Sequence, residues 1–354
     1  MDLLVYLVCI VVGVIGAVVG SYLPYILARR GVSVSKAIRV ATVSTGVFIA
    51  IALIPTVLFV VGFAGVFGFA GIAAVALYLM VQYLVAPLIF ISNTRRIELG
   101  SEYSWALDIA QKVAQRVGYS RRFEVRIADV EIPNAFAVGN VLKRAIVVHK
   151  GLLQVLDRDE VEAVLAHELG HLVHRDNAYL LATSFTPMIT YIIGIAMIVA
   201  GYAIVVSAGE ATRYRRSSQE SGFAALFGLG LMATGIAAAV TAIVVNLAVL
   251  AFSRIREHLA DLYAVRATGG YAIANALKKI ERVVAKYGIE EGRFTVKPKL
   301  RDMLYIVPQL AELTPSLSFI LSTHPPISMR IYIVRKYLEE LEQQRLSATT
   351  NTPT

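Results

Sequence analysis

His167-Glu168-Leu169-Gly170-His171 lies within residues 161–173, whose pattern predicts an α-helix. Two histidines four positions apart share one face of a helix, so both imidazoles can bind one zinc ion. The glutamate between them faces the same ion and can act as general base for a water held there. Asp157, with Glu160 three residues later, has the pattern of a capping box that begins this helix.

The composition indicates an integral membrane protein with a smaller polar part. Of 354 residues, 57% are hydrophobic and 17% are charged, whereas soluble domains carry about 25% charged residues. The net charge is +9, and such an excess in a membrane protein is typical of loops at an anionic lipid surface. The sequence has no basic-aromatic cluster, zinc finger or Gly-rich phosphate loop. We therefore predict contact with the lipid bilayer and none with nucleic acid.

Five apolar segments are long enough to cross a bilayer as helices, which takes roughly 20 residues each. Three precede the motif and two follow it: residues 3–27, 40–62, 69–91, 179–207 and 222–252. The Gly-rich, uncharged residues 63–68 predict a tight hairpin between the second and third segments.

Basic residues predict the orientation of these spans. Residues 29–39 and the pair Arg95-Arg96 are rich in positive charge, which is typical of cytoplasmic loops. We therefore expect a multi-pass protein of the plasma membrane whose segments around the histidine motif face the cytoplasm. The loop 210–220 would be external, although it holds three arginines, at positions 213, 215 and 216.

The polar regions predict one aqueous domain assembled from two parts of the chain. Their patterns predict helices over residues 101–117, 254–266, 271–287 and 327–345 and short strands over residues 122–128, 135–138 and 145–149. A small antiparallel sheet is the interpretation of these strands. The predicted organisation is three membrane helices in residues 1–92, catalytic parts in 93–177 and 253–346, two membrane helices in 178–252 and a disordered tail in 347–354.

A catalytic zinc site needs a third protein ligand and an open position for water. The chain's only cysteine, Cys9, lies in an apolar run, so this ligand has to be His, Glu or Asp. The pattern in which a third histidine follows in the same segment fails, because Asn177 occupies its position. The best candidate is Glu257. Asp261 lies one helical turn later and can accept a hydrogen bond from a ligand imidazole.

Four stretches, in this order, resemble the HtpX-like membrane zinc metalloproteases, which are related to the CaaX prenyl endopeptidases. They are residues 133–139 (Pro-Asn-Ala-Phe-Ala-Val-Gly), residues 166–171 (Ala-His-Glu-Leu-Gly-His) followed by Arg175-Asp176, residues 253–261, and residues 322–326 (Ser-Thr-His-Pro-Pro) with Arg330. The resemblance covers about residues 93–340, with two spans between the ligand helices as in the family. The family usually has two spans before its catalytic part, whereas this sequence predicts three.

The resemblance implies a mainly α, integral membrane fold with a zincin-like (gluzincin-type) α+β catalytic domain. It implies one zinc ion per chain, bound by His167, His171 and Glu257, with Glu168 as the catalytic base. It also implies that the substrates are polypeptides, namely misfolded membrane proteins removed in quality control under stress. No oligomeric state follows from the sequence.

Two interpretations fit the strand upstream of the motif. It is a structural strand, or it is an edge strand that pairs with an extended substrate through main-chain hydrogen bonds. In the second case Ala135, Phe136 and Ala137 bind substrate, and Asn134 either contacts it or caps the turn.

The C-terminal motif also leaves alternatives open. His324 fits a donor that stabilises the oxyanion of the tetrahedral intermediate, or a residue packed against Pro325-Pro326. Arg330 fits a substrate contact, or the partner of a carboxylate.

Three functions are compatible with this sequence. The first, which we predict, is a zinc endopeptidase of membrane-protein quality control. The second is a processing protease for one defined substrate, such as a lipidated chain. The third is a non-catalytic membrane scaffold, which the intact Glu168 disfavours because a scaffold need not retain the base.

Overall fold

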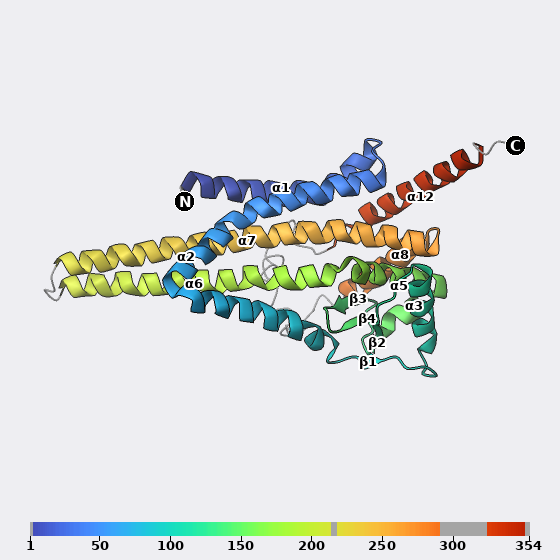
Figure 1. Cartoon of the computed structure of the whole chain (residues 1–354), viewed down its shortest axis with the longest axis horizontal. Helices are drawn as coiled ribbons and strands as arrows, with labels where there is room; N and C mark the ends of the chain where they lie inside the picture. The colour runs from blue at the N-terminus through green and yellow to red at the C-terminus, as the bar shows by residue number, and fades with distance from the viewer. Residues whose placement is uncertain (1–2, 214–217, 291–323, 351–354) are drawn as a thin grey trace.

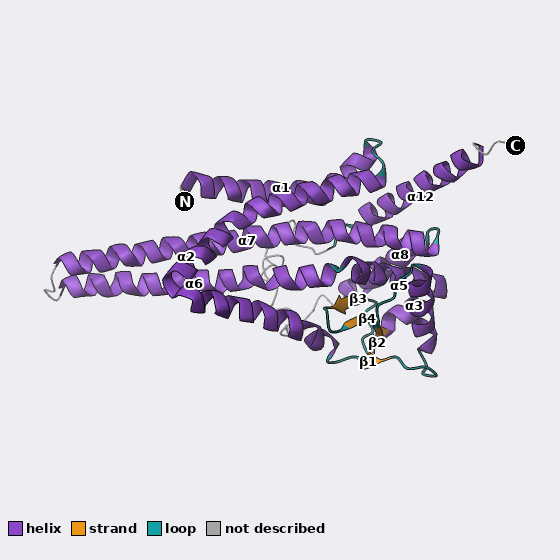
Figure 2. Ribbon diagram, in the orientation of Figure 1, coloured by secondary structure: helices purple, strands orange, loops and turns teal. Residues whose placement is uncertain are grey.

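The computed structural model describes residues 3–213, 218–290 and 324–350, and most of them are helical (Figures 1 and 2). Two N-terminal helices, α1 (Leu3–Arg29) and α2 (Val34–Ile91), precede a small domain that contains the sheet. Two long helices, α6 (Asp176–Arg213) and α7 (Ser218–Thr268), project from that domain as a side-by-side pair. The predicted mainly helical architecture is confirmed.

Within the described residues, four helices contain a stretch long and apolar enough to cross a membrane. These stretches are Tyr6–Arg29, Val34–Ile51, Thr190–Glu210 and Gln219–Thr268, and a shorter apolar helical stretch covers Met80–Ile91. The four stretches overlap the first, second, fourth and fifth predicted spans, and the shorter one lies within the third. The described residues up to position 92 contain two helices rather than the three predicted, because the second and third predicted spans belong to the single helix α2. Arg215 and Arg216, in the loop predicted to be external, lie outside the described residues.

The hairpin loop predicted at residues 63–68 is wrong. Helix α2 continues from Val34 to Ile91 without a non-helical connection. Figure 1 shows that α2 changes direction near its middle, so that its second half returns toward the sheet. A helical backbone satisfies its own hydrogen bonds, as a lipid environment requires, and this outweighs the preference of glycine for turns.

Helix α12 (Ile327–Thr350) runs farther than predicted, because residues 347–350 belong to it rather than to a disordered tail. Residues 351–354 lie outside the described part. The Glu340 carboxylate accepts hydrogen bonds of 2.9 and 3.1 Å from the backbone N–H of Val34, at the first turn of α2. Tyr332 packs edge-on against Tyr25 of α1, with ring centroids 5.0 Å apart. Helix α12 is thereby fixed to both N-terminal helices.

The sheet has four strands in the order β1 (Arg95–Arg96), β2 (Glu124–Ala128), β4 (Arg144–His149), β3 (Ala135–Gly139). It is mixed rather than antiparallel, because β2 and β4 run parallel. Central strands are buried on both faces and have continuous apolar runs, and residues 145–148 of β4 are such a run. Strand β3 pairs antiparallel with β4 and is an edge of the sheet.

Helix α5 (Arg158–His174) lies in the core and carries the histidine motif. It packs against α3 (Ser104–Arg116), α7 and α8 (Ala272–Glu290), while the short α4 (Lys150–Val155) follows β4. The predicted capping box is present, with both Asp157–Glu160 hydrogen bonds at 3.0 Å. Gly170 allows α7 to approach, because a Cβ there would lie 3.2 Å from the Cβ of Tyr263.

Helices α6 and α7 are in close contact through facing glycines. A Cβ at Gly194 would lie 2.7 Å from the carbonyl oxygen of Gly235, and a Cβ at Gly201 would lie 2.5 Å from that of Gly228. Small residues at these positions let membrane helices pack backbone to backbone. Helix α7 then continues without a break from its apolar stretch through the segment predicted to hold the third ligand.

Candidate active site

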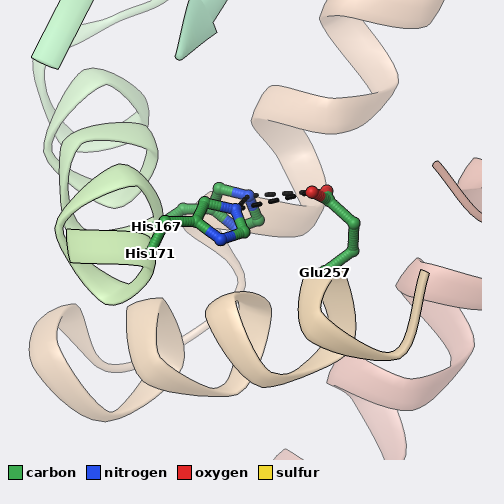
Figure 3. A group of neighbouring side chains, drawn as sticks. All are labelled: His167, His171 and Glu257. Atoms are coloured by element: carbon green, nitrogen blue, oxygen red, sulfur yellow. Dashed lines mark hydrogen bonds and ion pairs between the residues drawn. The ribbon is translucent and has the colours of Figure 1, made fainter. Parts of the chain in front are cut away.

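Helices α5 and α7 bring two imidazoles and one carboxylate together (Figure 3). One ligand atom each from His167, His171 and Glu257 lies within 4.8 Å of the other two. The two Nε2 atoms are 3.2 Å apart, and the Glu257 oxygens lie 3.6 Å from Nε2 of His167 and 3.4 Å from Nε2 of His171. Two imidazoles and a carboxylate form a donor set used by catalytic zinc sites, so the predicted ligands fit a metal ion.

Asp261 lies on the Nδ1 side of the His167 ring, whereas Glu257 lies on the Nε2 side. Its Oδ1 is 3.0 Å from Nδ1 of His167, which is an ion-pair distance. Arg330, from α12, donates to both oxygens of Asp261 at 2.8 and 2.6 Å and lies 3.1 Å from Glu257 Oε2. The pairing with a carboxylate predicted as one role of Arg330 is therefore observed.

Asp176 holds His171 in the same way, and the sequence interpretation missed it. Its Oδ2 lies 2.9 Å from Nδ1 of His171, and its Oδ1 accepts a 2.5 Å hydrogen bond from Nε of Arg256. Arg175, in the left-handed conformation at φ 58°, turns the chain between α5 and α6 and places Asp176 there. An acid five residues after the second histidine was the available signal.

The carboxylates around the two histidines favour positive charge on the imidazoles. Burial lowers the pKa of His171, but Asp176 and Glu257 outweigh burial and raise this pKa to about 10. Burial likewise opposes protonation of His167, while Asp261 and Glu257 outweigh it and raise the pKa. The site is built to stabilise a cation, and a metal that binds there has to displace protons.

We expect the substitution Asp176→Asn to weaken metal binding by about 10- to 100-fold, the usual cost of removing a carboxylate behind a ligand histidine. The amide keeps the size of the side chain but loses the charge that orients His171 and increases its basicity. Competition with a chromophoric zinc chelator measures the affinity. Asp159→Asn, at an exposed position in the first turn of α5, is the control. Equal affinity in the two variants would contradict this role of Asp176.

A cavity of about 450 Å³ lies against the three ligands, and Glu168 lines it. All six residues predicted to bind substrate also line it: Asn134, Ala135, Phe136, Ala137, His324 and Arg330. The rest of the lining is largely apolar and comes from α4, α5, α7, α8 and α12: Leu152, Val164, Val249, Leu250, Ile273, Leu277, Ile280 and Ile327. The cavity therefore joins the edge strand, the ligands and the membrane helix α7.

His324 lies at the open side of the cavity, next to a ligand. Its side chain is 63% exposed, and its Nδ1 lies 3.0 Å from Glu257 Oε2. Residues 322 and 323 of the same motif lie outside the described residues.

Comparison with known proteins places this site in a family. Residues 101–338 match peptidase family M48, and the chain belongs to that family. With its apolar helices and its His-His-Glu cluster, it is a multi-pass membrane metalloendopeptidase.

Its relatives are proteases of the HtpX type, as the resemblance implied. "Protease HtpX homolog" of Aeropyrum pernix is 32% identical over 277 residues, which are 71% of this chain and 81% of that protein. The homolog of Pyrobaculum calidifontis is 31% identical over 314 residues (83% and 81%), and that of Thermococcus sibiricus is 35% identical over 237 residues (66% and 74%).

A solved structure, "Crystal Structure of S. mikatae Ste24p", is 18% identical and covers 84% of this chain and 66% of its own. The TM-score between the two structures is 0.41.

Proposed function

We propose that this metalloendopeptidase uses one zinc ion per chain to cut misfolded membrane proteins in quality control. The observation that carries the proposal is the cluster of His167, His171 and Glu257, which lies beside Glu168 in one cavity. Helix α7, which contains a membrane stretch, also lines this cavity. A base and three ligands facing one cavity are the parts that hydrolysis of a peptide bond requires.

The residues of the site have distinct roles in the proposed reaction. Bound zinc supplies a Lewis acid for the scissile carbonyl and increases the acidity of the attacking water. Glu168, buried at the cavity wall, accepts the proton of that water and delivers it to the leaving amine. Asp261 and Asp176 keep the two imidazoles in orientation.

Strand β3 is the proposed binding site for the substrate backbone. Ala135, Phe136 and Ala137 line the cavity, and β4 covers only one edge of β3. An extended peptide can add to such an edge by main-chain hydrogen bonds. Asn134 directly precedes this strand. His324 is an exposed donor beside Glu257, so we assign it the role of donating a hydrogen bond to the oxyanion. Arg330 acts through the carboxylates that it binds.

We place the catalytic domain on the cytoplasmic side of the plasma membrane. The basic connection between α1 and α2 and the pair Arg95-Arg96 lie toward the same end of the molecule as the sheet and α5 (Figure 1). Positive loops favour the cytoplasmic side.

Cleavage assays with several unrelated membrane proteins, each folded and unfolded, test the substrate class. We expect the zinc-loaded enzyme to cut the unfolded forms of most of them and to spare the folded forms. Cleavage of one folded partner alone would instead favour the dedicated processing protease. Absence of cleavage in every zinc-loaded sample would favour the scaffold.

A further inference from the structure

The turn between β3 and β4, residues 140–143, is attached to the second half of α2. Asn140 is 5% exposed and makes this attachment. Its Oδ1 accepts hydrogen bonds from the backbone N–H groups of Leu142 and Lys143, at 2.9 and 2.8 Å. Its Nδ2 donates to the carbonyl oxygens of Tyr83 and Leu84 on α2, at 2.9 and 3.3 Å. The side chain thus shapes the turn and binds it to the helix.

Pro87 explains why α2 has an acceptor to offer at this point. In an α-helix the carbonyl of Tyr83 would accept a hydrogen bond from the N–H of residue 87. Proline has no N–H, so that carbonyl lacks its helical partner. Asn140 supplies the missing donor, and the Val141 N–H donates to the Tyr83 hydroxyl at 3.1 Å. A freed carbonyl in an apolar helix needs such a partner, because lipid offers none.

The tip of the turn carries two consecutive large apolar side chains in the open. Val141 is 65% exposed and Leu142 is 75% exposed. The α2 surface near the attachment is apolar and open as well, with Val81, Val85, Leu88 and Ile89 between 40% and 55% exposed. No charged residue occurs from position 40 to position 91. In a membrane protein, an exposed and uncharged apolar surface of this kind is suited to contact with lipid.

The depth of the attachment point along α2 agrees with contact to lipid. Tyr83 lies eight residues before the end of α2 at Ile91, which is about 12 Å along the helix axis. The first charged residues, Arg95 and Arg96, come after that end and are exposed. If these arginines lie among the lipid headgroups, the turn reaches the level of the acyl chains.

We propose that Val141 and Leu142 form a membrane-inserted tip whose partner is the acyl-chain region of the bilayer next to α2. The hydrogen bonds of Asn140 to Tyr83 and Leu84 hold the tip at that depth. Because β3 ends at Gly139, directly before the turn that carries the tip, the insertion also fixes the edge strand relative to the membrane.

Site-specific quenching tests this proposal, and the chain is suited to it because Cys9 is its only cysteine. In a Cys9→Ala background, Leu142→Cys is labelled with bimane and placed in phosphatidylcholine nanodiscs with ordinary or brominated acyl chains. Leu88→Cys on α2 is the matched membrane position. Leu346→Cys, an exposed position near the end of α12, is the matched aqueous position.

We expect brominated lipid to reduce the emission from positions 142 and 88, and aqueous iodide to reduce only the emission from position 346. Iodide quenching at position 142 as strong as at 346, without quenching by brominated lipid, would overturn the proposal. So would a label at position 88 that iodide reaches, because the adjacent α2 surface would then not face lipid.

Discussion

Glu168→Gln is expected to reduce cleavage by about 10²- to 10⁴-fold, the usual contribution of a general base, and to leave the metal content unchanged. Glutamine keeps the size of the side chain but cannot accept a proton from water at neutral pH. Glu168 lines the cavity yet is not one of the three clustered ligands, so metal binding should survive. Casein cleavage or self-cleavage gives the activity, and elemental analysis gives the zinc content.

Glu162→Gln is the matched control for this experiment. Glu162 lies on the same helix and forms an ion pair with Arg116 at 2.6 Å, away from the cavity. The control should keep full activity. Cleavage at the wild-type rate in the Glu168→Gln variant would rule out the proposed mechanism.

Glu257→Ala is expected to lower the bound zinc well below one ion per chain and to abolish cleavage. The variant leaves two imidazoles, whereas catalytic zinc sites use three protein ligands. Zinc should raise the thermal unfolding midpoint of the wild-type protein, because a ligand that binds the folded state stabilises it. The variant should lose this shift.

The control for the second variant is Glu220→Ala, an exposed position on the same helix. It should bind zinc as the wild type does. Size-exclusion chromatography of the metal-free proteins separates loss of a ligand from loss of the fold. Undiminished zinc in a folded Glu257→Ala protein would remove Glu257 from the site.

Short-range patterns account for the features that could be predicted. Spacing of four residues on a helix was sufficient to group His167 with His171 and Glu257 with Asp261, since the helix itself sets their common face. The capping box of α5 is equally local. Runs of apolar residues were long enough to predict the membrane stretches that the structure contains.

Features that depend on distant partners could not be predicted in the same way. Strands β2 and β4 pair in parallel because β3, which lies between them in the sequence, joins the sheet at its edge beside β4. The role of Asp176 depends on one left-handed residue, Arg175. Asn140 and Pro87 lie 53 positions apart in the sequence. Only the hydrogen bond from Asn140 to the Tyr83 carbonyl shows that Asn140 supplies the donor that Pro87 lacks.

The uninterrupted course of α7 has a consequence for how this sequence can vary. Glu257 stands on the same continuous helix as the apolar stretch that begins at Gln219. One residue added between the membrane-buried turns and Glu257 would rotate the carboxylate by about 100° and advance it by about 1.5 Å, away from both imidazoles. The number of residues in this lipid-facing segment therefore determines whether Glu257 faces the two imidazoles. The length of the segment is constrained, whereas its apolar side chains can be exchanged for other apolar ones.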